Sequence, residues 1–141
     1  MKNLFSVLGM ALMMMLAMTS CSDPDATTQL TDGIWKFNNM TTDSEDDDII
    51  LGVKALKLYH TEATIEFQSG GDFIKQYYLE QDPETGTWSL IGDDQLILTP
   101  DDGFPSTANI NELTKDKLKY VETFVDLELN AYSLTTTWVR D

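Results

Sequence analysis

The stretch Thr61-Glu62-Ala63-Thr64-Ile65-Glu66-Phe67 alternates polar and apolar side chains, with Ala63, Ile65 and Phe67 on one side. Strict period two predicts a strand with one buried face and one solvated face. The turn sequence Gln68-Ser69-Gly70-Gly71-Asp72 follows, and paired glycines accept the positive φ of a tight turn. The chain then returns over 73–80 as the second arm of a predicted hairpin.

The same combination of short strands and turn residues continues on both sides of this hairpin. Further strands are predicted at 34–37, 87–91, 95–99, 109–113, 117–123, 127–133 and 134–140. No segment shows helical periodicity sustained over three turns. Eight or nine strands with turn signals about every 8–12 residues indicate an antiparallel sandwich or barrel. A closed barrel would also hide the sheet edges that promote aggregation. We therefore predict an all-β domain.

Four segments are expected to be irregular or are ambiguous. Residues 22–31 are polar and predict a flexible tether, and 81–86 predict a turn. Residues 38–48 end in Glu45-Asp46-Asp47-Asp48, a run of like charges that predicts a solvated loop. Residues 49–59 fit one or two helical turns or a strand, and β-branched content favours a strand over the second half.

Residues 1–20 are typical of a removable leader. Lys2 precedes a nearly continuous apolar run from Leu4 to Ala17, which is too short to span a bilayer but matches the apolar core of a secretory signal. Ser20-Cys21 after this run resembles a bacterial lipobox. That resemblance implies cleavage before Cys21 and acylation of its sulfur and amine. The predicted organisation is a lipoprotein signal peptide at 1–20, a lipidated Cys21 with its tether at 21–31, and one domain at 32–141.

The charge balance restricts the classes of partner. Lys2 is the only charge in the leader and the whole chain has a net charge of −15, so the processed chain would carry −16. Such a chain lacks the clustered Lys and Arg needed to bind nucleic acid or anionic headgroups. Its predicted membrane attachment is therefore the lipid on Cys21. The acids after Cys21 are compatible with the outer membrane of a Gram-negative envelope and with exposure at the cell surface.

Three motifs carry a family resemblance over residues 32–140. They are Gly33-Ile34-Trp35 at the first strand, Gly86-Thr87-Trp88-Ser89-Leu90 with the strand after it, and the pattern I-x-x-L-T-x-D-x-L from Ile110 to Leu118. In this order they resemble the lipocalin-like (calycin-like) domains of small bacterial lipoproteins. The resemblance implies a single up-and-down antiparallel barrel of about eight strands. It also implies that Trp35 closes one end of the barrel, with Arg140 packed across it; the alternative is that Arg140 is a solvated terminal charge.

Catalytic and metal-binding motifs are weak in this sequence. His60 is the only histidine and is expected at the surface beside Tyr59. No serine has the G-x-S-x-G context of a nucleophile, and the acidic runs do not indicate two carboxylates on facing walls of a cleft. The acidic loops are expected to be solvated, with calcium binding as the alternative. We expect no enzymatic activity, no cofactor and no dedicated metal site.

Aromatic residues are the remaining functional clue. Tyr59, Phe73, Tyr77 and Trp88 lie on neighbouring predicted strands and could line a ligand site, although most are expected in the core. The leading hypothesis is a membrane-anchored binding module for a small apolar or amphipathic molecule. The alternative is a structural or protein-interaction lipoprotein of the envelope, whose barrel is filled by side chains.

Overall fold

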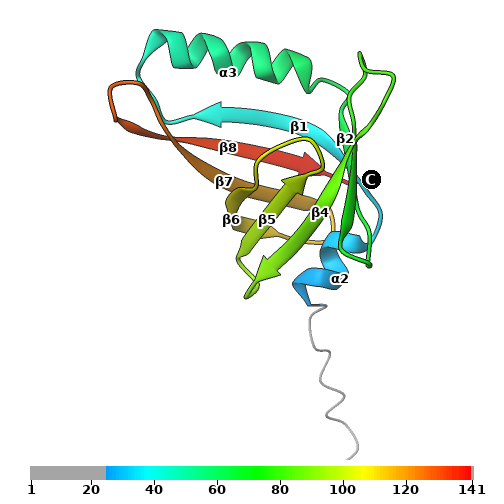
Figure 1. Cartoon of the computed structure of the whole chain (residues 1–141). Helices are drawn as coiled ribbons and strands as arrows, with labels where there is room; N and C mark the ends of the chain where they lie inside the picture. The colour runs from blue at the N-terminus through cyan, green and yellow to red at the C-terminus, as the bar shows by residue number, and fades with distance from the viewer. Residues whose placement is uncertain (1–24, 141) are drawn as a thin grey trace, which may run out of the picture.

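Eight antiparallel strands follow one another around a closed barrel in the computed structural model, which describes residues 25–140 (Figure 1). The strands are β1 (Ile34–Thr42), β2 (Thr64–Phe67), β3 (Asp72–Gln76), β4 (Glu84–Ile91), β5 (Gln95–Pro100), β6 (Ser106–Leu113), β7 (Lys117–Val125) and β8 (Ala131–Val139). Each strand pairs with its neighbours in sequence, and β8 returns to pair with β1. The predicted all-β, up-and-down barrel of eight strands is confirmed.

Inward-facing side chains fill the barrel along alternate strand positions. The burial pattern of β2 alternates strictly, as its sequence predicts. The largest fully buried side chains include two tryptophans and two phenylalanines from β1, β2, β3 and β8. The main core cluster comprises Leu30, Trp35, Ala63, Ile65, Phe67, Phe73, Tyr77, Trp88, Leu96, Ala108, Leu118, Tyr120 and Trp138. Burial of these side chains supplies the main driving force for folding, since the described residues contain no cysteine that could form a disulfide.

Part of the predicted tether is folded. Residues Ala26–Thr31 form the short helix α2, and the carboxylate of Asp25 accepts a hydrogen bond from the Thr28 amide at 2.8 Å as its N-cap. Leu30 is completely buried in the barrel core. No helical pattern is visible in this stretch of sequence because Leu30 is the only large apolar residue of α2. Residues 21–24 lie outside the described residues.

The largest difference from the sequence prediction is helix α3 (Asp47–Tyr59). Asp46, from the acidic run expected to be a loop, accepts hydrogen bonds from the amides of Asp48 and Ile49 and caps the helix. Val53 packs on Met40 and Leu134, which form a second apolar cluster. The predicted strand over the second half of 49–59 is therefore wrong, as is the predicted loop at 38–42, where β1 continues to Thr42.

Two further boundaries differ. Residues 127–130, predicted to begin a strand, belong to the connection between β7 and β8, and Leu129 has a positive φ of 66°. Leu127 and Leu129 alternate with polar residues as in a strand, but both are exposed in this connection. Gly86, predicted in a turn, lies inside β4, where it pairs with Phe73 and Pro100 on the neighbouring strands. A small residue fits here because Phe73 and the β5 backbone approach closely.

The alternating strand directions sort the connections into two ends of the barrel. The α2 end carries α2 and the connections at 68–71, 92–94 and 114–116. The α3 end carries α3 and the connections at 77–83, 101–105 and 126–130. β2 pairs with β1 only as far as Lys36, and beyond this point α3 lies alongside β1 (Figure 1).

Replacing Gly86 with alanine should destabilise the barrel. A Cβ at this position would overlap the Thr99 carbonyl oxygen and lie 2.7 Å from the Phe73 ring. We expect Gly86→Ala to lower the free energy of unfolding by ~1–3 kcal/mol, measured by urea denaturation. Gly52→Ala on α3 is the matched control because its added Cβ meets nothing within 4 Å beyond its chain neighbours and the backbone of its own helix. Equal stability of the two variants would contradict this packing argument.

Candidate functional site

Arg140 and Trp35 lie together at the α2 end. The guanidinium carbon of Arg140 is 4.0 Å from the centroid of the Trp35 ring, within cation–π range. The same guanidinium donates hydrogen bonds to the carbonyls of Gln29 (2.9 Å), Asp32 (2.6 Å) and Lys115 (2.8 Å from Nε). The Trp35 ring nitrogen donates to the Leu30 carbonyl at 2.9 Å. Arg140 therefore links α2, the start of β1 and the β6–β7 turn.

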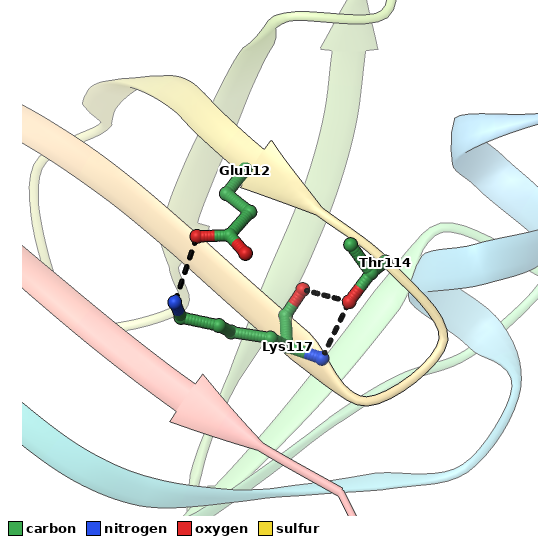
Figure 2. A network of polar contacts seen from close by, with 3 residues as sticks. All are labelled: Glu112, Thr114 and Lys117. Atoms are coloured by element: carbon green, nitrogen blue, oxygen red, sulfur yellow. Dashed lines mark hydrogen bonds and ion pairs between the residues drawn. The ribbon is translucent and has the colours of Figure 1, made fainter.

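Gly33 and Thr114 shape the backbone that receives Arg140. Gly33 has a φ of +112°, which other residues rarely adopt. At the β6–β7 turn, the Thr114 hydroxyl accepts from the Lys117 amide at 3.1 Å, and Lys117 forms a 2.8 Å ion pair with Glu112 (Figure 2). The glycine of G-x-W and the threonine of the I-x-x-L-T pattern thus have direct structural roles at this end.

Three of the four candidate ligand-lining residues, Phe73, Tyr77 and Trp88, belong to the packed core, and Tyr59 packs against it. Phe73 is 1% exposed. Trp88 stacks edge-on against Phe67, with ring centroids 5.6 Å apart, and its ring nitrogen donates to the Gln68 carbonyl at 3.0 Å. These contacts fill the barrel toward the α2 end. They explain the burial of Phe73 and Trp88 without a ligand.

The fourth candidate, Tyr59, packs against the Tyr77 ring nearer the α3 end. Their ring centroids are 4.6 Å apart, and the Tyr77 hydroxyl donates to a Glu84 carboxylate oxygen at 3.0 Å. Burial, followed by the Glu84 charge, raises the pKa of Tyr77 above its usual range. The Tyr59 hydroxyl donates to Glu80, and this hydrogen bond raises its pKa. Both hydroxyls therefore remain protonated and act as donors at neutral pH.

His60 joins this aromatic group, and the prediction that it lies at the surface is wrong. It is 7% exposed and follows α3, where its Nδ1 lies 2.8 Å from the Leu56 carbonyl oxygen. Its ring packs against Phe37 and Tyr77. Burial lowers the pKa of His60, and the nearby charge of Lys75 lowers it further. The misplacement follows from the missed helix, because α3 turns its last residue inward.

Lys75 is an interior charge beside this group that the sequence analysis did not identify. It lies on β3 between the inward-facing Phe73 and Tyr77, the residue that follows the strand. Its Nζ is 5.0 Å from the centroid of the Tyr77 ring and 5.9 Å from that of Trp138. Burial lowers the pKa of Lys75, while the carboxylates of Glu84 and Glu122 act to raise it. Period two applied to Phe73, Lys75 and Tyr77 was the signal that could have found it.

Tyr120 and Glu122 lie on β7, and the charge of Glu122 acts on Lys75. The Tyr120 hydroxyl accepts from the Trp138 ring nitrogen at 3.2 Å, and burial raises the pKa of Tyr120. Burial also raises the pKa of Glu122, against a hydrogen bond from Ser106 and the charge of Lys75. We call Lys75, Tyr77, Glu84, Tyr120 and Glu122 the inner polar cluster. It can offer both donors and acceptors to a ligand within the barrel.

Exposed apolar side chains gather at the α3 end. Ten of the twelve large exposed apolar residues among residues 25–140 lie there: Leu51, Leu56, Leu58, Tyr78, Leu79, Phe104, Phe124, Val125, Leu127 and Leu129. Phe104 is 93% exposed, and Leu127 is fully exposed. Such a concentration at one end of a small domain is typical of a binding surface.

A groove opens between the start of α3 and the β7–β8 connection. It has a volume of about 360 Å³ and is lined by Asp46, Asp48, Ile49, Val125, Asp126, Leu127, Glu128 and Tyr132. A larger surface pocket of about 560 Å³ lies at the α2 end, between α2 and β6. Neither hollow is lined by Tyr59, Phe73, Tyr77 or Trp88. Within residues 25–140, no group of three or more His, Cys, Asp or Glu side chains is arranged to hold a metal.

Comparison with known proteins identifies the family of this barrel. The lipocalin-like domain family matches residues 31–120, and the chain belongs to this family. A crystal structure of a DUF4847 family protein from Bacteroides vulgatus is similar at 14% sequence identity and a TM-score of 0.45, covering 76% of this chain and 93% of that one. A search of curated proteins finds no match. A lipocalin-like barrel indicates, in general terms, a binding module.

None of the helices within residues 25–140 has the length and apolar character needed to cross a bilayer. Cys21, the predicted lipidation site, lies outside the described residues.

Removing the Arg140 guanidinium should weaken the α2 end. Arg140→Met keeps the aliphatic stem but loses the hydrogen bonds to three carbonyls, and we expect it to cost ~1–3 kcal/mol of unfolding free energy. Trp35→Ala should cost ~3–5 kcal/mol because the ring is fully buried. Lys54→Met, on the exposed face of α3, is the control. Unchanged urea midpoints for both test variants would show that this contact does not hold the barrel closed.

Proposed function

We propose that this protein is a lipid-anchored, non-catalytic binding module that takes a small amphipathic molecule from the α3 end of its barrel. The inner polar cluster carries the proposal. A barrel that needed only stability would place apolar side chains at these inward positions, because burying an amine and a carboxylate costs free energy. Lys75 and Glu122 nevertheless occupy them, beside aromatic rings that present apolar faces.

The arrangement favours a ligand with an apolar body and a polar oxygen. Exposed Phe104 and Tyr78 supply apolar contact area at the α3 end. The Lys75 ammonium has three donor hydrogens, and its two aromatic neighbours contact it through their ring faces. A carbonyl, hydroxyl or carboxylate oxygen of the ligand would accept from it, while the packed aromatic core limits how deeply the ligand can enter.

A second candidate function is protein interaction by a filled barrel. It is supported by Phe73 and Trp88, which are both packed in the core, and by the exposed apolar side chains of the α3 end. The two candidates differ in whether a folded barrel retains a small molecule.

Native mass spectrometry distinguishes them. Residues 23–141 retain all of the described structure and would be incubated with an envelope lipid and metabolite extract. We expect a bound species of defined mass on the wild type and at least a tenfold weaker retention on Lys75→Met, about 1.4 kcal/mol. Lys119→Met, on an outward position of β7, is the matched control. If the folded wild-type domain shows only the mass of the protein alone, the small-molecule proposal is wrong and protein interaction is the favoured function.

The anchor is the second part of the proposal. The apolar run before Cys21 and its resemblance to a lipobox support acylation, and the acids after it are compatible with the outer membrane of a Gram-negative envelope. Cys21 precedes Asp25 by four residues, which reach at most about 14 Å when extended. Since Asp25 begins α2, a lipid on Cys21 would hold the α2 end toward the membrane and leave the α3 end facing away.

Substituting the cysteine tests the anchor. We expect the full chain, produced in a Gram-negative host, to lose residues 1–20, gain acyl mass and partition into the detergent phase of a phase-separation assay. Cys21→Ala should retain the leader and lack the acyl mass, whereas Ser22→Ala should behave as the wild type. Normal cleavage of Cys21→Ala, without loss of membrane attachment, would contradict the lipobox prediction.

A further inference from the structure

The groove between α3 and the β7–β8 connection has a chemistry distinct from the barrel interior. Ile49 and Tyr132 are partly buried at its sides, whereas Val125 and Leu127 are exposed. Its volume of about 360 Å³ suits a few side chains of a single segment rather than the broad surface of a folded domain. We propose that this groove binds a basic amphipathic segment of a partner protein. The inference goes beyond the proposed small-molecule function and does not use Lys75.

Four carboxylates surround the apolar part of the groove: Asp46, Asp48, Asp126 and Glu128. Two of them have structural roles, because Asp46 caps α3 and Asp126 accepts from the amides of Glu128 and Asn130, both at 2.8 Å. None of the four is ion-paired with a lysine or arginine within residues 25–140. A segment carrying Lys or Arg beside its apolar side chains would complement the groove in both charge and polarity.

The wall of the groove formed by the β7–β8 connection is held in place before any partner arrives. Besides the amide bonds to its carboxylate, the Asp126 amide donates to the Asn130 carbonyl at 3.0 Å, and the Leu129 amide donates to the Asp126 carbonyl at 3.1 Å. The Asn130 side chain also donates to Asp126 at 3.2 Å. This network presents Leu127 to solvent in a fixed conformation, so binding need not order the turn.

The chain's charge favours a protein segment over a membrane surface as the occupant. A net charge of −15 repels anionic headgroups, and the acidic side chains flanking Leu127 would have to be brought to the bilayer with it. The same charge accelerates encounters with a basic partner through long-range attraction. The partner is therefore expected to bind less tightly as ionic strength rises.

Peptide binding to the full-length protein tests the groove. The probe is a fluorescein-labelled peptide of Leu and Lys, about 14 residues long and amphipathic as a helix. A peptide with Glu in place of every Lys is its control. Fluorescence anisotropy at low salt should show binding of the basic peptide only. Leu127→Ser and Glu128→Lys should each weaken binding at least tenfold.

Matched variants separate the groove from general attraction to an acidic protein. Ile91→Ser removes an exposed apolar side chain at the α2 end, and Asp82→Lys makes the same charge change in the β3–β4 connection. Both should stay within about twofold of the wild-type affinity, since neither residue lines the groove. Three results would overturn the proposal: no binding of the basic peptide, equal binding of the acidic peptide, or equal losses in the groove and control variants.

Discussion

The contact between Arg140 and Trp35 lies where the last strand of the barrel meets the first. β8 pairs with β1, so the last strand must return to the first, and Arg140 follows directly after it. Its guanidinium then lies against the Trp35 ring and bonds carbonyls from α2, the start of β1 and the β6–β7 turn. A planar group with several donors suits this position because three backbone segments meet there with outward-pointing acceptors.

The α3 end of the barrel is built differently from the α2 end, because a helix takes the place of a strand beside β1. β2 is short and stops pairing with β1 at Lys36, so α3 rather than a strand lies along the rest of β1. α3 buries Val53 against Met40 and directs His60 inward. The long β7–β8 hairpin extends on the same side (Figure 1), which leaves space for a groove between the hairpin and the start of α3. The unequal lengths of the strands therefore create both the exposed apolar surface of the α3 end and the groove beside α3.

The sequence predicted the strands better than it predicted this asymmetry. Alternation in Ala63–Phe67 and the G-x-W motif are local signals, and they led to the barrel and to the pairing of Trp35 with Arg140 as one of two alternatives. α3 was missed because Ile49, Ile50 and Val53 have high strand propensity, and its cap, Asp46, lay within an acidic run. Lys75 was missed because a charged residue is usually assigned to solvent, although its neighbours in the alternation face inward. These outcomes depend on tertiary contacts that no short window of sequence contains.

The placement of costly groups argues that function is concentrated at the α3 end. Toward the α2 end, polar groups such as Trp35 Nε1 and Trp88 Nε1 are bonded to backbone carbonyls, and large side chains are fully buried. Toward the α3 end, an amine lies inside the barrel, carboxylates surround an apolar groove and leucines face solvent. The interior amine lowers stability, and the exposed leucines lower solubility, relative to a simple substitution at the same position. The exposed leucines and the groove lie at the end opposite α2, the end that the proposed anchor on Cys21 would hold toward the membrane.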